Sequence, residues 1–171
     1  MKTWRIALAL TVLAIVHEGC KGKEKVKEIS TSARAEAVQN FSEAEFATQI
    51  RDHARAEALL AHAVELNSEE PNYWLQLGAS RKRLGNLAGA RKAYEKAREL
   101  AQAAYKRDKK IPDPLFAEME VCVLLGKPEE ARRIYERVIR DHGADPRIQR
   151  FVRDHVLDAM LAAPRLKEMS L

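Results

Sequence analysis

Few side chains in this sequence have the types and the spacing that a reactive or metal-binding site needs. The five histidines are His17, His53, His62, His142 and His155. No two of them are three or four residues apart, so no helix face carries the pair of ligands that zinc sites on helices use. The one histidine three residues from a cysteine, His17 before Cys20, lies in an apolar N-terminal segment. Because a metal site needs three or four convergent ligands, we predict no metal site and no cofactor.

The other candidates for chemistry have simpler structural interpretations. Cys122 stands in the apolar run 121–125, which offers no base or cation to activate a thiol, so we interpret it as an inert core residue. Acidic residues such as Glu118 and Glu120 are typical of the solvated face of a helix. The glycine-containing segment 85–89 suits a turn between helices better than a phosphate-binding loop. We therefore predict no catalytic residues and no small-molecule substrate, and we expect that the protein is not an enzyme.

Basic residues are concentrated in the middle of the chain. Residues 71–110 hold eleven Lys and Arg against three acidic residues, whereas residues 20–70 hold seven against ten and residues 111–171 hold ten against eleven. This excess fits an acidic protein, anionic lipid headgroups or nucleic acid as a partner, but it is more often the solvated face of a long helix. No aromatic residues alternate with the basic ones as stacking platforms for bases, so we expect no nucleic-acid partner.

The N-terminal residues resemble an export signal. Lys2 and Arg5 flank the start of an uncharged, mostly apolar run at residues 6–16. A helix of this length reaches about half of the ~30 Å hydrocarbon core of a bilayer, so the run fits a secretory signal better than a membrane-spanning helix. A buried N-terminal helix is the alternative. We prefer the signal because the run is apolar on all faces and a charge cluster follows it at residues 21–27.

The pair Gly19-Cys20 resembles the end of a bacterial lipobox, in which a small residue precedes a lipidated cysteine that becomes the mature N-terminus. The resemblance implies that Cys20 carries a lipid that tethers the protein to the periplasmic face of a membrane. His17 and Glu18 depart from the lipobox pattern, which has an aliphatic and a small residue at these positions. A cleaved signal that releases a soluble periplasmic or secreted protein is therefore an alternative, and so is a cytosolic protein.

The rest of the sequence favours helices. With 171 residues, of which 46% are apolar and 32% charged, the chain is long enough for one globular domain with its own core. Gly and Pro number only seven and six. Ala, Leu, Glu, Arg and Lys dominate, and these residues favour helices over strands. We therefore predict an all-α fold.

One stretch, residues 71–102, has the pattern of a helical hairpin. Its diagnostic residues are Trp74, Leu77, Gly78, Gly85, Ala90, Tyr94 and Ala97. The first three share a helix face with Arg81, where Gly78 leaves room for a neighbouring helix, and Gly85 stands at the turn. Small alanines then let a second helix pack closely while Tyr94 fills the space between the two. This stretch resembles a tetratricopeptide repeat, although Arg81 replaces the large apolar residue that the family usually has.

Related hairpins are expected on either side. Ala56 precedes Ala90 by the length of one repeat, and Gly126 follows Gly85 by a repeat that is seven residues longer. The seven additional residues make about two helical turns, so we predict one lengthened helix at about 87–106 whose apolar stripe stays in phase. The predicted organisation begins with a signal or lipobox-like segment at 1–20 and a charged linker at 21–32. A repeat domain follows at 33–163, and a loose tail ends the chain at 164–171. Within the repeat domain we predict hairpins at 33–67, 71–107 and 113–142 and a capping helix at 147–162. The resemblance implies that these hairpins stack in a right-handed superhelix.

The family resemblance also implies where a partner binds. Tetratricopeptide repeats line a concave groove mainly with their first helices, and matching this sequence position by position gives eight residues. They are Leu75, Gln76, Ala79, Lys82, Arg83, Phe116, Ala117 and Glu120. Members that clamp the acidic C-terminus of cytosolic chaperones have Lys, Asn and Arg at such positions. Because Leu75, Ala79 and Phe116 are apolar, we expect no such clamp, and a mixed apolar and basic groove suits an extended or helical peptide.

The function that the sequence predicts is a protein-interaction scaffold of the bacterial cell envelope. Its groove is expected to bind a peptide or protein, and the layout resembles lipid-anchored tetratricopeptide proteins that assist the assembly of a pilus, a secretion channel or an outer-membrane complex. A cytosolic adaptor and the regulatory subunit of an envelope enzyme are the alternatives.

Overall fold

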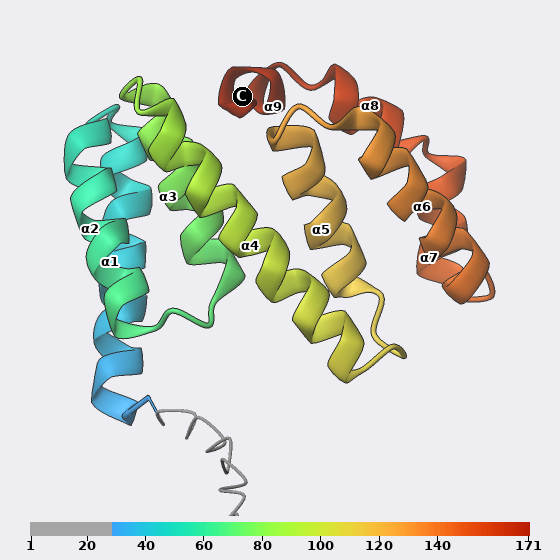
Figure 1. The fold of residues 1–171 in the computed structure, drawn as a ribbon, viewed down its shortest axis with the longest axis horizontal. Helices are drawn as coiled ribbons and strands as arrows, with labels where there is room; N and C mark the ends of the chain where they lie inside the picture. Colours follow the sequence, from blue (N-terminus) through green and yellow to red (C-terminus); the bar gives the residue numbers. More distant parts are fainter. Residues whose placement is uncertain (1–28) are drawn as a thin grey trace, which may run out of the picture.

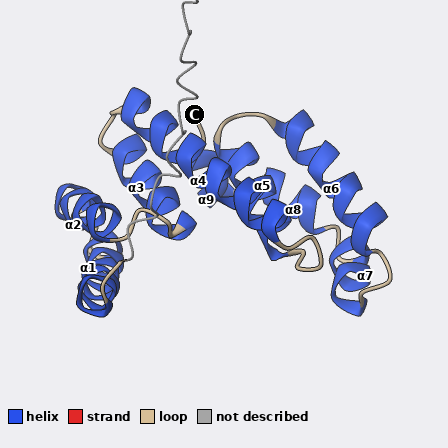
Figure 2. Cartoon of the chain, turned by 60° about the horizontal axis from the view of Figure 1, so that its bottom comes forward, coloured by secondary structure: helices blue, strands red, loops and turns tan. Residues whose placement is uncertain are grey.

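The structure, a computed structural model, describes residues 29–171, and these residues form nine α-helices joined by short connections (Figure 1). The helices are α1 (Thr31–Gln49), α2 (His53–Leu66), α3 (Pro71–Arg83), α4 (Leu87–Arg107), α5 (Asp113–Leu124), α6 (Pro128–His142), α7 (Pro146–Arg153), α8 (Val156–Ala162) and α9 (Pro164–Met169). The first six pair as three antiparallel hairpins that stack side by side (Figures 1 and 2). The predicted all-α stack of helical hairpins is confirmed.

The predicted signal segment, Cys20 and most of the charged linker lie outside the described residues. The end of that linker belongs to the fold, because α1 begins at Thr31 and is capped by Ser30, whose side chain accepts a hydrogen bond from the Ala33 N–H (3.2 Å). Among the helices at 29–171, none combines the length and the apolar character that crossing a bilayer requires.

The turns within the three hairpins share one backbone geometry. In the second hairpin Gly85 follows α3 with a φ of 78°, and the next N–H, that of Asn86, donates a hydrogen bond to the Arg81 carbonyl (2.9 Å). This is a Schellman motif, in which a left-handed residue ends the helix. Gly126 follows α5 with a φ of 69°, and Arg51 follows α1 with a φ of 61°. The turns at Arg51, Gly85 and Gly126 thus repeat with the spacing that the sequence predicts, first by one ordinary repeat and then by the lengthened one.

The apolar core runs through the stack as three adjoining clusters. The first joins α1, α2, α3 and α4 and combines four buried alanines with Leu60 and Tyr73. The second joins α3, α4 and α5 around Tyr94, whose side chain is fully buried. The third joins α4 to the helices that follow it, around Leu115 and Met119. The hairpins therefore share their core with their neighbours, as stacked repeats do.

The predicted long helix is α4, which spans 21 residues. Its last two turns bury Ala101 and Tyr105. The Tyr105 hydroxyl donates a hydrogen bond to Asp141 of α6 (3.1 Å). The additional seven residues thus extend the same buried stripe to the third hairpin, as two whole helical turns allow.

The region after α6 differs from the expected single capping helix. The helix breaks at His155, which adopts a φ of 50° and precedes α8. Ile148 of α7 and Leu157 of α8 are both buried in the third cluster. At their separation along the chain, they would point to opposite sides of a continuous helix. The break is what allows both side chains to enter the same core.

The expected loose tail is ordered. Residues 164–169 form α9, and Met169 is 2% exposed. The Leu171 N–H donates a hydrogen bond to the Leu124 carbonyl at the end of α5 (2.8 Å). An apolar residue and a backbone hydrogen bond therefore fix a segment whose polar sequence predicts no structure.

Candidate functional site

The eight predicted groove residues lie on the first helices of the second and third hairpins. Helix α3 carries Leu75, Gln76, Ala79, Lys82 and Arg83, and α5 carries Phe116, Ala117 and Glu120. Helix α9 contacts both α3 and α5, so the two sets border one surface (Figure 1). Six of the eight side chains are partly exposed, whereas Leu75 is 8% and Ala79 is 0% exposed.

Leu75 and Ala79 are closed to a partner in this conformation because they are buried in a cluster that α9 shares with α3, α4 and α5. Both belong to an apolar cluster that includes Met169, and Leu166 and Leu171 pack against the same cluster. The middle of the predicted groove is therefore filled by the chain itself.

Two hydrogen bonds to the backbone fix α9 in this position. The buried Tyr94 hydroxyl donates to the Met169 carbonyl (2.8 Å), and the Leu171 N–H donates to the Leu124 carbonyl (2.8 Å). Burial raises the pKa of Tyr94 above its usual range, although Arg83 acts in the opposite direction. The hydroxyl therefore keeps its proton and remains a hydrogen-bond donor.

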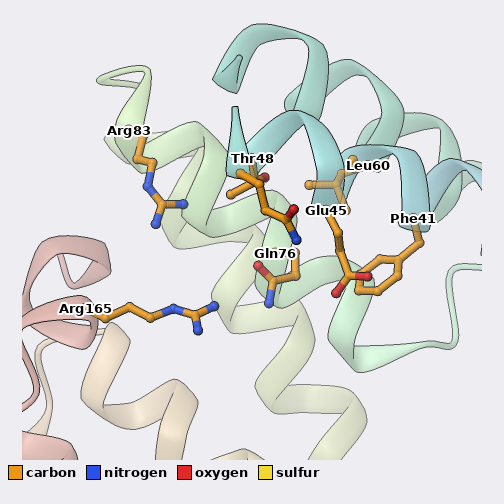
Figure 3. Close-up of a pocket in the computed structure, with 9 residues that line it drawn as sticks. Phe41, Glu45, Thr48, Leu60, Gln76, Arg83 and Arg165 are labelled. Carbon is orange, nitrogen blue, oxygen red and sulfur yellow. The ribbon is translucent and has the colours of Figure 1, made fainter. Parts of the chain in front are cut away.

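A hollow of about 390 Å³ opens on one side of α9, between α1, α3 and α9 (Figure 3). We call it the α1–α3 hollow. Arg83 and Arg165 project toward it from α3 and α9, while Phe41 and Glu45 line it from α1 (Figure 3). Arg83 is also paired with Glu168 of α9, since its Nε lies 3.2 Å from Oε1 of that carboxylate. The hollow thus combines cationic, anionic and aromatic groups.

A second hollow, of about 350 Å³, lies between α5, α7 and α8. We call it the α5–α8 hollow. It is lined by Phe116, Ala117, Met119, Glu120, Phe151 and Met160. The rings of Phe116 and Phe151 are in contact, with centroids 4.7 Å apart. Burial raises the pKa of Glu120, although nearby Arg165 lowers it. This hollow is mainly apolar, with one carboxylate at its edge.

Three of the eleven basic residues at 71–110 are paired with acidic side chains from neighbouring helices. Arg81 Nε donates to Glu57 Oε1 of α2 (2.9 Å), which explains how a cation occupies a position where the family has an apolar residue. Arg83 pairs with Glu168, and Arg98 pairs with Glu130 of α6. These ion pairs favour a structural role for the three arginines Arg81, Arg83 and Arg98.

Glu118 is not the solvated carboxylate that the sequence predicts. It is 4% exposed and accepts hydrogen bonds from Gln102 Nε2 (2.6 Å) and Arg137 Nη2 (2.9 Å), while Arg98 Nε lies 3.7 Å away. These partners come from α4 and α6, so the carboxylate joins three helices. Because its oxygens are occupied by partners from this chain, Glu118 acts as a structural tie.

Cys122 has the environment of an inert core thiol. It is free and fully buried, and burial raises its pKa to about 11 although Arg98 lowers it. The thiolate that a nucleophile or a metal ligand requires is therefore disfavoured. No group of three or more His, Cys, Asp or Glu side chains suited to a metal ion occurs within residues 29–171.

Known families match the part of the chain that holds these helices. One model of the tetratricopeptide repeat matches residues 71–105, and another matches residues 90–154. The chain is a tetratricopeptide repeat protein. The two matches together include α3 to α7, whereas α1 and α2 precede them. No curated protein matches the sequence.

Among solved structures, this repeat protein is similar to two from bacteria. The Yersinia enterocolitica type III secretion chaperone SycD, in complex with a peptide of the translocator YopD, is 22% identical, with 82% of this chain and 98% of that chain covered and a TM-score of 0.47. PcrH from Pseudomonas aeruginosa is 20% identical, with 81% and 96% covered and a TM-score of 0.45.

The contribution of α9 to the groove is the main feature that the sequence does not reveal. Leu166 and Met169 of α9, and Leu171 just after it, are the large apolar residues of a segment that is otherwise mainly polar and charged. Six residues are too few for a helical period to stand out. The partner of the Tyr94 hydroxyl is a backbone carbonyl, which leaves no mark on the residue type.

Proposed function

We propose that this tetratricopeptide repeat protein binds a protein partner on the surface formed by α3 and α5, and that the α1–α3 hollow and the α5–α8 hollow hold parts of that partner. The observation that carries the proposal is that five of the eight predicted groove residues line these hollows. Gln76 and Arg83 line the α1–α3 hollow, and Phe116, Ala117 and Glu120 line the α5–α8 hollow, so apolar and charged side chains are combined. Ligand sites in proteins typically have this mixture, in which apolar contacts supply affinity and a few polar groups supply orientation.

The shape and chemistry of the hollows favour a peptide segment over a small molecule. The α5–α8 hollow offers the aromatic side chain Phe116 beside the carboxylate of Glu120, and the α1–α3 hollow offers Arg83 and Arg165. A segment that spans both meets apolar and charged contacts in turn, as helical grooves that bind amphipathic helices do.

The test is a selection of peptides from a display library against the full chain. Selected peptides are expected to lose about ten-fold or more in affinity for Phe116→Ala, since a central aromatic contact is typically worth ~2 kcal/mol in an interface. The matched control is Ile139→Ala, which truncates a 37% exposed apolar residue on α6. Melting curves of both variants verify that they are folded. Equal affinity for the two variants, or a selection that yields no binder, would contradict the proposal.

We further propose that the protein works at the cell envelope, anchored by a lipid on Cys20, where its binding surface assists the assembly of a pilus, a secretion channel or an outer-membrane complex. The support is the sequence of residues 1–20 alone, with its apolar run and the pair Gly19-Cys20. Cell fractionation of a tagged copy and incorporation of radiolabelled palmitate test this. Label that persists in Cys20→Ser, or a tagged copy in the cytosol, argues against the anchor.

A further inference from the structure

Helix α9 occupies the middle of the proposed binding surface, and we infer that residues 164–171 act there as an internal ligand. The partner that binds the middle of the groove is then a short amphipathic segment of the same chemistry, which displaces these residues. This inference rests on the proposed function and specifies both the class of partner and what competes with it.

Helix α9 packs on an apolar site formed by the first helices of the second and third hairpins. We call this site, which includes Leu75, Ala79 and Leu124, the seat of α9. Met169 is 2% exposed and shares its cluster with Leu75 and Ala79 of α3 and with Leu124 of α5. Leu166 packs against the same cluster. Two of the residues that the family resemblance assigns to partner binding, Leu75 and Ala79, thus belong to the cluster that holds the segment.

The two hydrogen bonds that hold the segment use its backbone, so any peptide can form them. Tyr94 donates to the carbonyl of Met169, and the Leu124 carbonyl accepts from the Leu171 N–H. Both bonds involve the backbone of the segment, so they require no particular side chain. A partner that displaces the segment has to supply a carbonyl to Tyr94, because an unpaired buried hydroxyl is costly.

One contact of the segment selects for charge. Arg83, whose side chain is 14% exposed, lies with Nε 3.2 Å from Oε1 of Glu168. Together with the apolar contacts, this pair defines a pattern of three apolar residues at i, i+3 and i+5 with an acidic residue at i+2. In the chain itself the positions are Leu166, Glu168, Met169 and Leu171. A partner with this pattern matches the seat in both shape and charge.

The segment is weakly held compared with the hairpins. Helix α9 has only six residues, and a helix of this length has little stability of its own in water. Met169 is the one fully buried side chain within 164–171. Each hairpin, by contrast, has two helices of at least twelve residues and buries many side chains in the clusters that it shares with its neighbours. Opening of the segment is therefore a local event that leaves the repeats folded.

The experiment measures binding of a fluorescent synthetic peptide with the sequence of residues 163–171 to the full chain and to Leu166→Ala/Met169→Ala. In the unmodified chain, the peptide binds only to the molecules in which residues 164–171 have left the seat. The apparent affinity for the peptide is therefore the intrinsic affinity multiplied by the fraction of such molecules. We therefore expect the double variant to bind the peptide at least about ten-fold more tightly than the unmodified chain does. Equal affinity for both, or no binding to a folded double variant, overturns the inference.

A second pair of variants locates the binding. Adding Ala79→Arg to the double variant places a charged side chain in the seat of Met169 and is expected to abolish binding. Ala88→Arg, on an exposed residue of α4, is the matched control and is expected to leave binding unchanged. Binding that survives Ala79→Arg in a folded chain places the peptide elsewhere and overturns the inference.

Amide hydrogen exchange of the unmodified chain gives a result even if the double variant does not fold. A saturating excess of unlabelled peptide is expected to accelerate exchange of the Leu171 and Ser170 amides while amides of α3 and α5 stay protected. Unchanged exchange overturns the inference. If library-selected peptides bind while the segment peptide binds neither chain, this inference fails alone; if the library also yields no binder, the proposed function fails with it.

Discussion

The ring of Tyr94 lies directly against the backbone of Gly78, so that a Cβ atom built on residue 78 would fall 2.5 Å from Cδ1 of the tyrosine. The absence of a side chain at residue 78 lets the ring cross α3 and lets the hydroxyl reach the Met169 carbonyl, 2.8 Å away. One glycine thus connects two features of the molecule, the tight packing of the second hairpin and the seat of α9.

Gly78→Ala is expected to destabilise the protein by about 1–3 kcal/mol, because the added methyl group forces the buried Tyr94 ring to move. In an open helix the same change is favourable by about 1 kcal/mol, since alanine is the better helix former. The steric cost of the added methyl group therefore has to exceed the gain in helix propensity. Urea unfolding followed by circular dichroism measures the difference.

The control for this change is the same substitution with the tyrosine truncated. In Tyr94→Ala, which is itself destabilised by the loss of a buried ring, Gly78→Ala has room and is expected to be neutral or stabilising. If Gly78→Ala costs the same free energy in both backgrounds, the contact between the two residues does not explain the glycine.

Arg51→Gly is expected to stabilise the first hairpin by about 0.5–1 kcal/mol. Arg51 has a φ of 61°, which costs a residue with a side chain about 1–2 kcal/mol, whereas glycine adopts it freely but loses more backbone entropy on folding. Gly85→Arg is the reciprocal variant, at the equivalent turn, where a Cβ meets no atom within 4 Å. It should lower the melting temperature while Arg51→Gly raises it; shifts of the same sign for the two variants would contradict this explanation.

The hairpins could be predicted from the sequence because their positions are repeated. The alanine at which two helices pack closely, Ala90 in the second hairpin, recurs as Ala56 in the first hairpin and Ala131 in the third. The glycine of the turn and the tyrosine between the two helices recur only in the third hairpin. Each type has one physical reason to be there. Even the turn at Arg51, which has the wrong residue type, keeps the spacing. A repeated pattern supplies several independent signals for one structure.

The C-terminal part and the buried charges could not be predicted in this way. The break at His155 follows from a requirement of the core, that Ile148 and Leu157 enter the same cluster, and no breaker residue marks it. In the sequence, nothing distinguishes Glu118 from an exposed carboxylate on a helix. Arg98 and Arg137 come close to it only in the folded structure. Position in three dimensions, and not residue type, decided both features.

Glu118→Ala is expected to destabilise the protein by about 2–3 kcal/mol. Removing one partner of a buried ion pair typically costs about 3–5 kcal/mol, but Arg98 and Arg137 are 23% and 36% exposed, so their charges are partly solvated once the carboxylate is gone. Chemical denaturation measures the change. Glu129→Ala, on an 82% exposed carboxylate of α6, is the control and should change stability by less than about 0.5 kcal/mol. Similar effects of the two variants would show that burial of Glu118 is unimportant.

The thiol of Cys122 makes stability depend on pH in the alkaline range. Burial raises its pKa to about 11, whereas an unfolded chain has a cysteine pKa of about 8.5. Between these values the unfolded chain releases the proton and the folded chain retains it, so the free energy of unfolding falls as pH rises. The contribution is complete below about pH 8.5 and is lost as pH rises toward 11.

We therefore expect the unfolding free energy of the Cys20→Ser chain to decrease more between pH 8 and 10.5 than that of Cys20→Ser/Cys122→Ala, by about 2 kcal/mol. Lysines and tyrosines also titrate in this range, but they are common to both chains and cancel in the comparison. Iodoacetamide provides an independent measurement, because alkylation requires the thiolate: Cys122 should react slowly at pH 8 in the folded chain and quickly in urea. Rapid alkylation of the folded chain, or identical pH profiles of the two chains, would show that Cys122 is not the protonated core thiol that its burial implies.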